Sequence, residues 1–279
     1  MPITFLITHP ASKFETDQLV GNVTEALRAR GIEQITKIQD NAYQREQVRF
    51  LDLVGSELLL PLITLRWRFQ LNKKARYLFV HSLVALLQVL HGLFNLIASG
   101  LSMKKMLQLR NKNLRILNIS AAHLSAWRQG VKSHQDYICV LEDDGIFHDV
   151  LGLSRVVDWI YREVNPSEYA LVDVSNSYSF EELGVSQAGV NTVFNLVEHG
   201  QRVVQTQNPI TNTCAAVIYS RGLLTLLEKF LTKSLDDKFM RSVPIDWQIN
   251  RFFMNAPKKF RFKTLHVVPG LIRQGSFDT

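Results

Sequence analysis

A short apolar run that ends in three consecutive acids, within Tyr137–Gly145, restricts the architecture of this chain more than any other segment. Its five apolar residues, mostly β-favouring, offer two apolar faces, which is typical of a central parallel strand covered by helices on both sides. Glu142, Asp143 and Asp144 follow directly. Ligands of open α/β sheets bind beyond the carboxyl ends of the strands. The sequence therefore predicts an α/β fold with a mostly parallel, Rossmann-type sheet and a ligand site at these acids.

The acids themselves indicate a cation. Adjacent carboxylates at the end of a buried strand repel each other unless a positive charge offsets them. Mg²⁺ and Mn²⁺ prefer carboxylate oxygens and leave room for substrate phosphates. If the strand continues, Glu142 and Asp144 point to one side and Asp143 to the other. We expect Glu142 and Asp144 to hold Mn²⁺ or Mg²⁺, although a solvated acidic turn remains the alternative for this tripeptide alone.

Apolar periodicity predicts the neighbouring elements. A strand over Ile3–Thr8, an amphipathic helix over Glu15–Arg30 and a strand over Glu33–Ile38 form a strand–helix–strand unit, which implies parallel pairing. Downstream we expect strands at 114–118, 170–174, 192–196 and 202–205, and helices at 121–133, 150–164, 223–230 and 247–254. Ser120 and Ser220 are expected to cap two of these helices, and Asp246 could cap the last.

The segment 46–112 is unusual in charge. From Leu58 to Gln135 there are 12 Lys and Arg and no Asp or Glu, so the rest of the chain carries a net charge of −5. Tyr77 to Met103 contains no charged residue, and leucines recur in it at helical spacing. Three alternatives remain open: a helical hairpin packed on the sheet, a pair of helices lying on an anionic membrane surface, or a membrane span.

Composition sets further bounds. The 279 residues can bury a large core, and 46% hydrophobic with 20% charged residues fits a globular protein. The two cysteines, Cys139 and Cys214, lie in apolar segments and are expected to be buried thiols. The first residues show no secretory signal pattern, so we expect a cytoplasmic protein. The basic block lies beside leucines, and we expect no nucleic-acid binding.

Five motifs in order carry a resemblance to a known family. They are Ser120-Ala121-Ala122-His123 with Trp127, the acids at 142–144, Thr213-Cys214-Ala215-Ala216 leading to Ser220-Arg221-Gly222, Pro244-Ile245-Asp246 and the terminal Pro269 with Gln274. Their order resembles the bacterial lipooligosaccharide glycosyltransferases of family 25 over roughly residues 115–279. The chain departs from the family at Cys214 and Ala216, where glycine is usual.

The resemblance implies one GT-A-like domain over 1–279, interrupted by a helical insertion at 46–112. It implies an inverting transfer of a sugar, with galactose from UDP-galactose as the expected donor, to a lipooligosaccharide or other glycan. Asp246 would be the catalytic base, and Glu142 and Asp144 would hold the metal ion. The nucleotide sugar would be bound by His123, Asp143, Thr213, Arg273 and Gln274. With the basic insertion, this implies a peripheral protein on the inner face of the bacterial inner membrane.

Two of these residues could have a purely structural role, and the protein as a whole could have a different function. His123 and Trp127 share one helix face and could simply pack against the sheet. Asp246 could serve only as a helix cap. At the level of function, a catalytically degenerate, membrane-docked scaffold is the alternative to the enzyme. A nucleotidyltransferase would share the metal, but it would need a glycine-rich basic loop near the first strand, which the sequence lacks.

Overall fold

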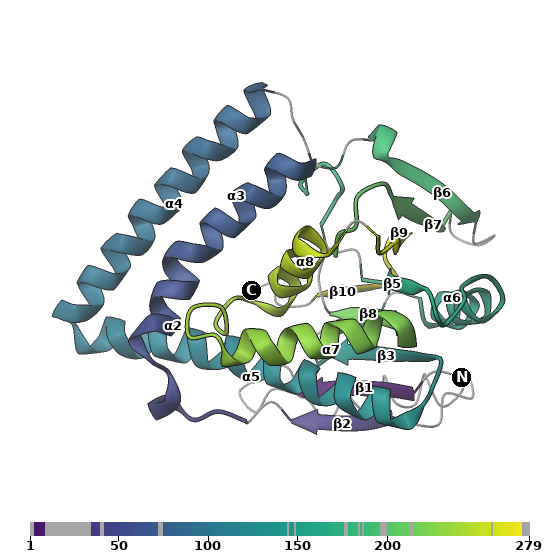
Figure 1. Cartoon of the computed structure of the whole chain (residues 1–279), viewed down its shortest axis with the longest axis horizontal. Coiled ribbons are helices and arrows are strands. Elements are labelled where there is room, and N and C mark those ends of the chain that lie inside the picture. Colours follow the sequence, from purple (N-terminus) through teal and green to yellow (C-terminus); the bar gives the residue numbers. More distant parts are fainter. Residues whose placement is uncertain are drawn as a thin grey trace.

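The computed structural model describes residues 3–8, 35–39, 42–71, 75–143, 145–147, 149–175, 178–183, 185, 187–195, 200–211, 215–257 and 259–274. The described part is an α/β structure built on an eight-stranded sheet with the order β2-β1-β3-β8-β5-β9-β7-β6 (Figure 1). Its strands are β1 (Ile3–Thr8), β2 (Ile35–Gln39), β3 (Tyr137–Glu142), β5 (Tyr169–Asp173), β6 (Val190–Asn195), β7 (Arg202–Thr206), β8 (Ala216–Ser220) and β9 (Phe262–Val268). A small antiparallel ribbon joins β4 (Gly145–Phe147) to β10 (Ile272–Gln274).

The helices follow the same chain order. They are α2 (Phe50–Val54), α3 (Leu60–Leu71), α4 (Ala75–Leu101), α5 (Met103–Ser133), α6 (Val150–Glu163), α7 (Arg221–Asp236) and α8 (Ile245–Asn255). A π-turn at Gly55–Leu59 joins α2 to α3, and 3₁₀ turns lie at Arg45–Gln47 and Gln187–Gly189. The expected helix at Glu15–Arg30 lies outside the described residues.

The sheet is mixed, so the expected mostly parallel sheet is not confirmed. Strands β2, β1 and β3 pair in parallel, as the strand–helix–strand pattern predicts, and β5 pairs in parallel with β9. Strand β8, however, lies antiparallel between β3 and β5, and β7 lies antiparallel between β9 and β6. Because β8 runs against both of its neighbours, β3 and β5 still run in the same direction and end at the same edge of the sheet.

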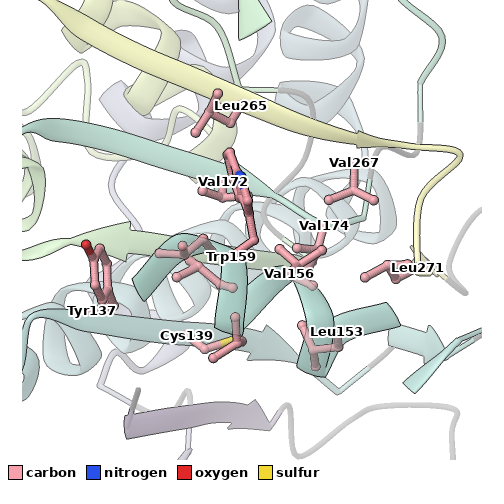
Figure 2. Packing of buried hydrophobic residues seen from close by; sticks show 14 of the residues in the cluster. Tyr137, Cys139, Leu153, Val156, Trp159, Val172, Val174, Leu265, Val267 and Leu271 are labelled. Atoms are coloured by element: carbon pink, nitrogen blue, oxygen red, sulfur yellow. The ribbon is translucent and has the colours of Figure 1, made fainter. Parts of the chain in front are cut away.

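Strand β3 is buried on both faces, as its apolar sequence predicts. Tyr137, Cys139 and Leu141 face a cluster in which Leu153, Val156 and Trp159 of α6 cover the sheet (Figure 2). The alternate residues Ile138 and Val140 face the opposite cluster, which α5, α7 and α8 supply. The protein thus has three layers, with the sheet in the middle. Cys139 is a buried free thiol, and burial raises its pKa to about 12, whereas Cys214 lies outside the described residues.

Most of the expected local elements are present. Helix α6 begins after Asp149, whose side chain accepts a hydrogen bond from the N–H of Gly152, and α7 begins after Ser220, whose hydroxyl accepts from the N–H of Leu223. Strands β5, β6 and β7 lie within one or two residues of the expected ranges. A proline, Pro244, precedes the first turn of α8, and Asp246 lies inside that turn, so the alternative in which Asp246 caps the helix was wrong.

The expected strand at 114–118 was also wrong. Those residues belong to α5, a continuous helix of 31 residues, and Ser120 is a buried interior residue of that helix, not its cap. A short apolar run cannot by itself be assigned to a strand or to a buried helix. Here Leu117 packs in a small cluster with Leu53 and Leu96, which lie on α2 and α4. Contacts with other helices therefore decide the conformation of this segment.

Residues 50–101 form an arm of helices beside the sheet. Figure 1 shows α4 along the outer edge of the molecule, with α3 between it and α8. Trp67 of α3 packs edge-on against Trp247 of α8, with ring centroids 5.2 Å apart. Among the described elements, the main contacts of α4 are with α3, the π-turn and α5 and not with a strand of the sheet.

Candidate active site

The end of β3 brings one of the predicted acids against a histidine. Residues of β3 alternate between the two faces of the sheet, and Ile138 and Val140 face the layer of α5. Glu142 continues that series and meets His123 of α5, whose Nε2 lies 3.0 Å from its Oε1. His123 is fully buried, and the Nε2–H of its ring donates to the carboxylate oxygen of Glu142. His123 therefore fixes the orientation of Glu142.

Asp246 belongs to the same electrostatic environment. It lies in the first turn of α8, partly buried. Its pKa is raised to about 6, chiefly because burial disfavours the charged carboxylate and further because Glu142 adds negative charge, while the N–H of Trp247 donates a hydrogen bond that opposes the rise. Glu142 and Asp246 are 104 positions apart in the sequence, and the fold brings their charges within reach of each other. A carboxyl group with a pKa of this kind suits proton transfer near neutral pH.

Aromatic side chains lie beside Asp246. Tyr178 has a raised pKa, because it is buried and because Asp246 and Glu182 add negative charge near it. Tyr178 and Trp247 pack with Trp67 in a cluster that also contains Phe180, Leu183 and Ile210. Sugars present apolar faces that lie well on aromatic rings. The Trp next to Asp246 signalled this surface in the sequence, whereas Tyr178 carried no local signal and is recognised only from the fold.

The C-terminal strand runs beside the acidic turn. Arg273 pairs with Ile146 and Gln274 with Gly145 in the antiparallel ribbon of β10 and β4, so the backbone of both predicted ligands lies next to the segment that follows the acids. The N–H of Leu271 donates to the carbonyl of Val174, 2.9 Å away, which ties this strand to the residue that follows β5. The side chains of Arg273 and Gln274 lie outside the described residues.

The remaining predicted residues divide into two groups. Asp143 is described and partly buried, and it has an interaction partner. Asp144 and Thr213 lie outside the described residues. Of the predicted site residues, the structure thus brings together His123, Glu142 and Asp246.

A second acid lies at the same edge of the sheet. Asp173 ends β5 and is paired in register with His266 of β9. Both side chains are fully buried, and His266 Nδ1 lies 3.8 Å from Asp173 Oδ2. Asp173 Oδ1 also accepts from the N–H and hydroxyl of Ser175, at 2.9 and 2.7 Å. Asp173 was apparent in the sequence only as the polar end of a strand, and its pairing with His266 depends on strand register.

The donors suit a hard divalent ion only in part. Among the described residues, no group of three or more His, Cys, Asp and Glu is arranged to hold a metal ion. Glu142 nevertheless supplies carboxylate oxygens, and its negative charge adds to the effect of burial in raising the pKa of Asp246. A cation beside Glu142 would offset that charge. Of the two residues expected to hold Mn²⁺ or Mg²⁺, the structure describes Glu142, whereas Asp144 lies outside the described residues.

An open pocket of about 360 Å³ lies nearby but does not include the acids. Its lining comes from α3, from the end of α8 and from the segments at 208–209 and 256–262. Trp67 lines it and also contacts Trp247, the neighbour of Asp246. Because its walls are mostly apolar and carry no carboxylate, we assign the chemistry to the end of β3 and not to this pocket.

No protein-family model matches the chain, and no curated protein matches it either. The class that the fold establishes is therefore an α/β protein with a mixed sheet, and the activity must be argued from the residues at the sheet edge.

Proposed function

We propose that the protein is a metal-dependent, inverting glycosyltransferase with a GT-A-like fold, similar to family 25, that moves galactose from UDP-galactose to a lipooligosaccharide or other glycan. The observation that carries the proposal is the convergence of the His123–Glu142 pair and Asp246 beside the carboxyl end of β3. That edge is where open α/β sheets bind nucleotides. The common direction of β2, β1, β3, β5 and β9 supports the GT-A-like assignment.

Asp246 has the properties of a general base. With a pKa of about 6, it is ionised at neutral pH and remains basic enough to accept a proton from an acceptor hydroxyl. Removal of that proton as the sugar bond to the diphosphate breaks gives direct displacement with inversion at the anomeric carbon. Trp247 and Tyr178 stand beside the carboxylate, where they can hold a sugar ring in place.

Glu142 and Asp144 would hold the divalent ion, which when bound supplies Lewis-acid stabilisation of the departing nucleotide diphosphate. His123 orients Glu142 for that role from the buried side of the sheet. Arg273 and Gln274, in the strand beside the acidic turn, together with Asp143 and Thr213, are proposed to contact the nucleotide sugar.

The test is nucleotide release from UDP-galactose with Mn²⁺ present. Asp144→Asn is expected to abolish metal-dependent turnover with the fold retained, because one carboxylate ligand is lost. Asp246→Asn is expected to lower turnover by about 10²–10⁴-fold, the usual effect of losing a general base. Asp158→Asn, an exposed acid on α6, is the matched control and should leave turnover unchanged. Full activity of the Asp144 variant would refute the metal assignment.

The same assay separates the enzyme from a degenerate scaffold. If the folded wild-type chain released no nucleotide from any UDP-sugar with Mn²⁺ or Mg²⁺, the scaffold alternative would replace the proposal. Circular dichroism of each variant establishes that loss of turnover is not loss of fold.

A further inference from the structure

We infer that α4 docks the protein onto an anionic lipid surface, lying along the bilayer with its leucine-rich face in the interface. Helix α4 exposes a continuous apolar face, which includes Phe79 at 72%, Leu87 at 58% and Phe94 at 61% exposure. The exposed large apolar residues of this helix are Phe79, Val80, Leu83, Val84, Leu86, Leu87, Leu90, Leu93, Phe94, Ile97 and Leu101. Exposed apolar patches of this extent mark interaction surfaces.

A helix on the surface of a soluble protein normally buries its apolar face and exposes its polar one, whereas α4 does the reverse. Its inward face carries Ala85, Gly92, Leu96 and Ser99, which are buried, and Asn95, whose Nδ2 donates to Glu57 Oε2 at 3.1 Å. Apart from Leu96, small and polar residues thus meet the protein, while most leucines and both phenylalanines of α4 point away from it. The backbone of α4 approaches Glu57 so closely at Gly92 that a Cβ there would meet the Glu57 carbonyl, which fixes this face of the helix against the protein.

Basic residues at both ends of α4 indicate that the surface bound by its apolar face is anionic. Arg76 is exposed at the start of α4, and Lys104 and Lys105 are exposed just after its end. Lys105 Nζ lies 5.3 Å from the centroid of the Phe94 ring, which is one of the exposed apolar side chains of α4. No Asp or Glu occurs from Leu58 to Gln135. Lysines beside an apolar helix face bind the head groups of anionic lipids.

A second copy of the chain fits this face less well. In a two-fold interface the same patch meets itself, so the basic ends of two α4 helices would approach each other with no acid of this segment to offset them. An anionic lipid surface offsets both ends at once.

The topology excludes a simple span by α4, although the helix is long and apolar enough to cross a bilayer, with only 11% of its most apolar window buried. Strands β2 and β3 flank the segment in the sequence and both pair with β1 in one sheet, so they lie on the same side of any membrane. To return the chain across the bilayer, α3 would have to place Arg66 and Arg68 inside it, and Trp67 of α3 packs instead against Trp247 of α8. Helix α5 carries Lys104 and Lys105, and its second half packs on the sheet.

The apolar face is tested by sedimentation of the full chain with vesicles of phosphatidylglycerol and phosphatidylethanolamine, and with vesicles of phosphatidylcholine alone. The wild type is expected to bind the anionic vesicles more tightly, and added salt should weaken that binding. Leu90→Gln should weaken it by about tenfold, because one buried leucine leaves the interface. Val193→Gln, an exposed apolar residue on β6, is the matched control and should have no effect.

The role of the two lysines is tested with two double variants that lose the same charge at different places. Lys104→Gln with Lys105→Gln should weaken binding to the anionic vesicles by about fivefold per lysine. Lys229→Gln with Lys233→Gln removes the same charge from the exposed face of α7 and should leave binding unchanged. Equal loss in the two double variants would show that only overall charge matters and would overturn the specific role of α4.

Two further results would also overturn the inference. One is absence of binding to anionic vesicles. The other is a stable dimer in solution that Leu90→Gln converts to a monomer, since a second copy would then cover the face. The inference depends on α3 to α5 and not on sugar transfer. Leu90→Gln should therefore keep the nucleotide release of the wild type, and loss of turnover throughout would count against the proposed function while leaving the docking result intact.

Discussion

At the scale of single residues, Asp246 combines two opposing properties. Its carboxyl group has a pKa of about 6, because it is removed from water and lies near the charge of Glu142. The same environment that makes it a useful base makes its ionised form costly to the folded state. Functional groups with strongly shifted pKa values commonly lower stability in this way.

This conflict predicts a pH-dependent gain in stability for Asp246→Asn. The folded chain binds the proton of Asp246 more tightly than the unfolded chain, so its contribution to the free energy of unfolding is highest below the ordinary pKa and falls as the pH rises through about 6. The neutral asparagine avoids that loss. Urea unfolding above pH 7 should show the variant more stable by about 1–3 kcal/mol, with little difference near pH 4.

The same group predicts the pH dependence of turnover. If Asp246 is the base, nucleotide release by the wild type should rise with pH through about 6, since only the ionised carboxylate accepts a proton. A rate that stays constant across this range would contradict the assignment, and an unfolding free energy that differs equally at both pH values would contradict the origin of the shift.

At the scale of secondary-structure elements, α4 is held by close backbone contact and not by a large apolar interface with the protein. A methyl group at Gly92 would meet the backbone carbonyl of Glu57, whereas a methyl group at Gly100 would meet nothing within 4 Å. The carboxylate of Glu57 also accepts from Lys112 of α5 at 2.6 Å, so it links α4, the π-turn and α5. The packing of α4 therefore depends on a few specific contacts.

These two glycines give a matched pair of substitutions. Gly92→Ala should lower the free energy of unfolding by about 1–3 kcal/mol, because the added methyl forces α4 away from Glu57. Gly100→Ala should raise it by up to about 1 kcal/mol, because alanine favours the helix and meets no neighbour. Denaturant unfolding of both variants checks the prediction, and equal effects would show that α4 is not held at Gly92.

At the scale of the whole molecule, a buried ion pair joins the helical arm to the segment that precedes α8. Arg241 donates to both carboxylate oxygens of Asp52, at 2.5 Å each, and to the carbonyl of Gln47 at 2.8 Å. Asp52 is fully buried and Arg241 nearly so, and hydrogen bonding to Asp52 raises the pKa of Arg241. The pair therefore connects α2 to the part of the chain that leads to Asp246.

Removing one partner of this pair should be severe. Asp52→Asn is expected to cost about 3–5 kcal/mol, because it leaves the Arg241 charge buried without its counter-ion. The control is Glu228→Gln, which breaks a more exposed pair with Arg128 and should cost under about 1 kcal/mol. Thermal and urea unfolding measure both, and a small effect at Asp52 would indicate that water replaces the lost contact.

How well an element could be predicted from the sequence depended on how far apart in the chain its interacting residues lie. Helix α6 was predictable because its apolar residues recur at helical spacing, and strand β3 because its short, β-favouring apolar run is buried on both faces. The segment at 114–118 was not, because Leu117 is helical through contacts with Leu53 and Leu96. In the candidate site, the acids at the end of β3 were evident from the sequence, but the contact of His123 with Glu142 and the approach of Asp246 needed the fold.

The sequence alone determined the α/β class, the acidic end of a buried strand and a basic, acid-free segment around an apolar helix, since composition and periodicity are properties of neighbouring residues. Only the tertiary structure decided that β8 runs antiparallel between β3 and β5, that Glu142 lies against His123, and that α4 turns its leucines outward. Each of these outcomes depends on contacts between residues far apart in the chain, where packing and charge outweigh any local preference.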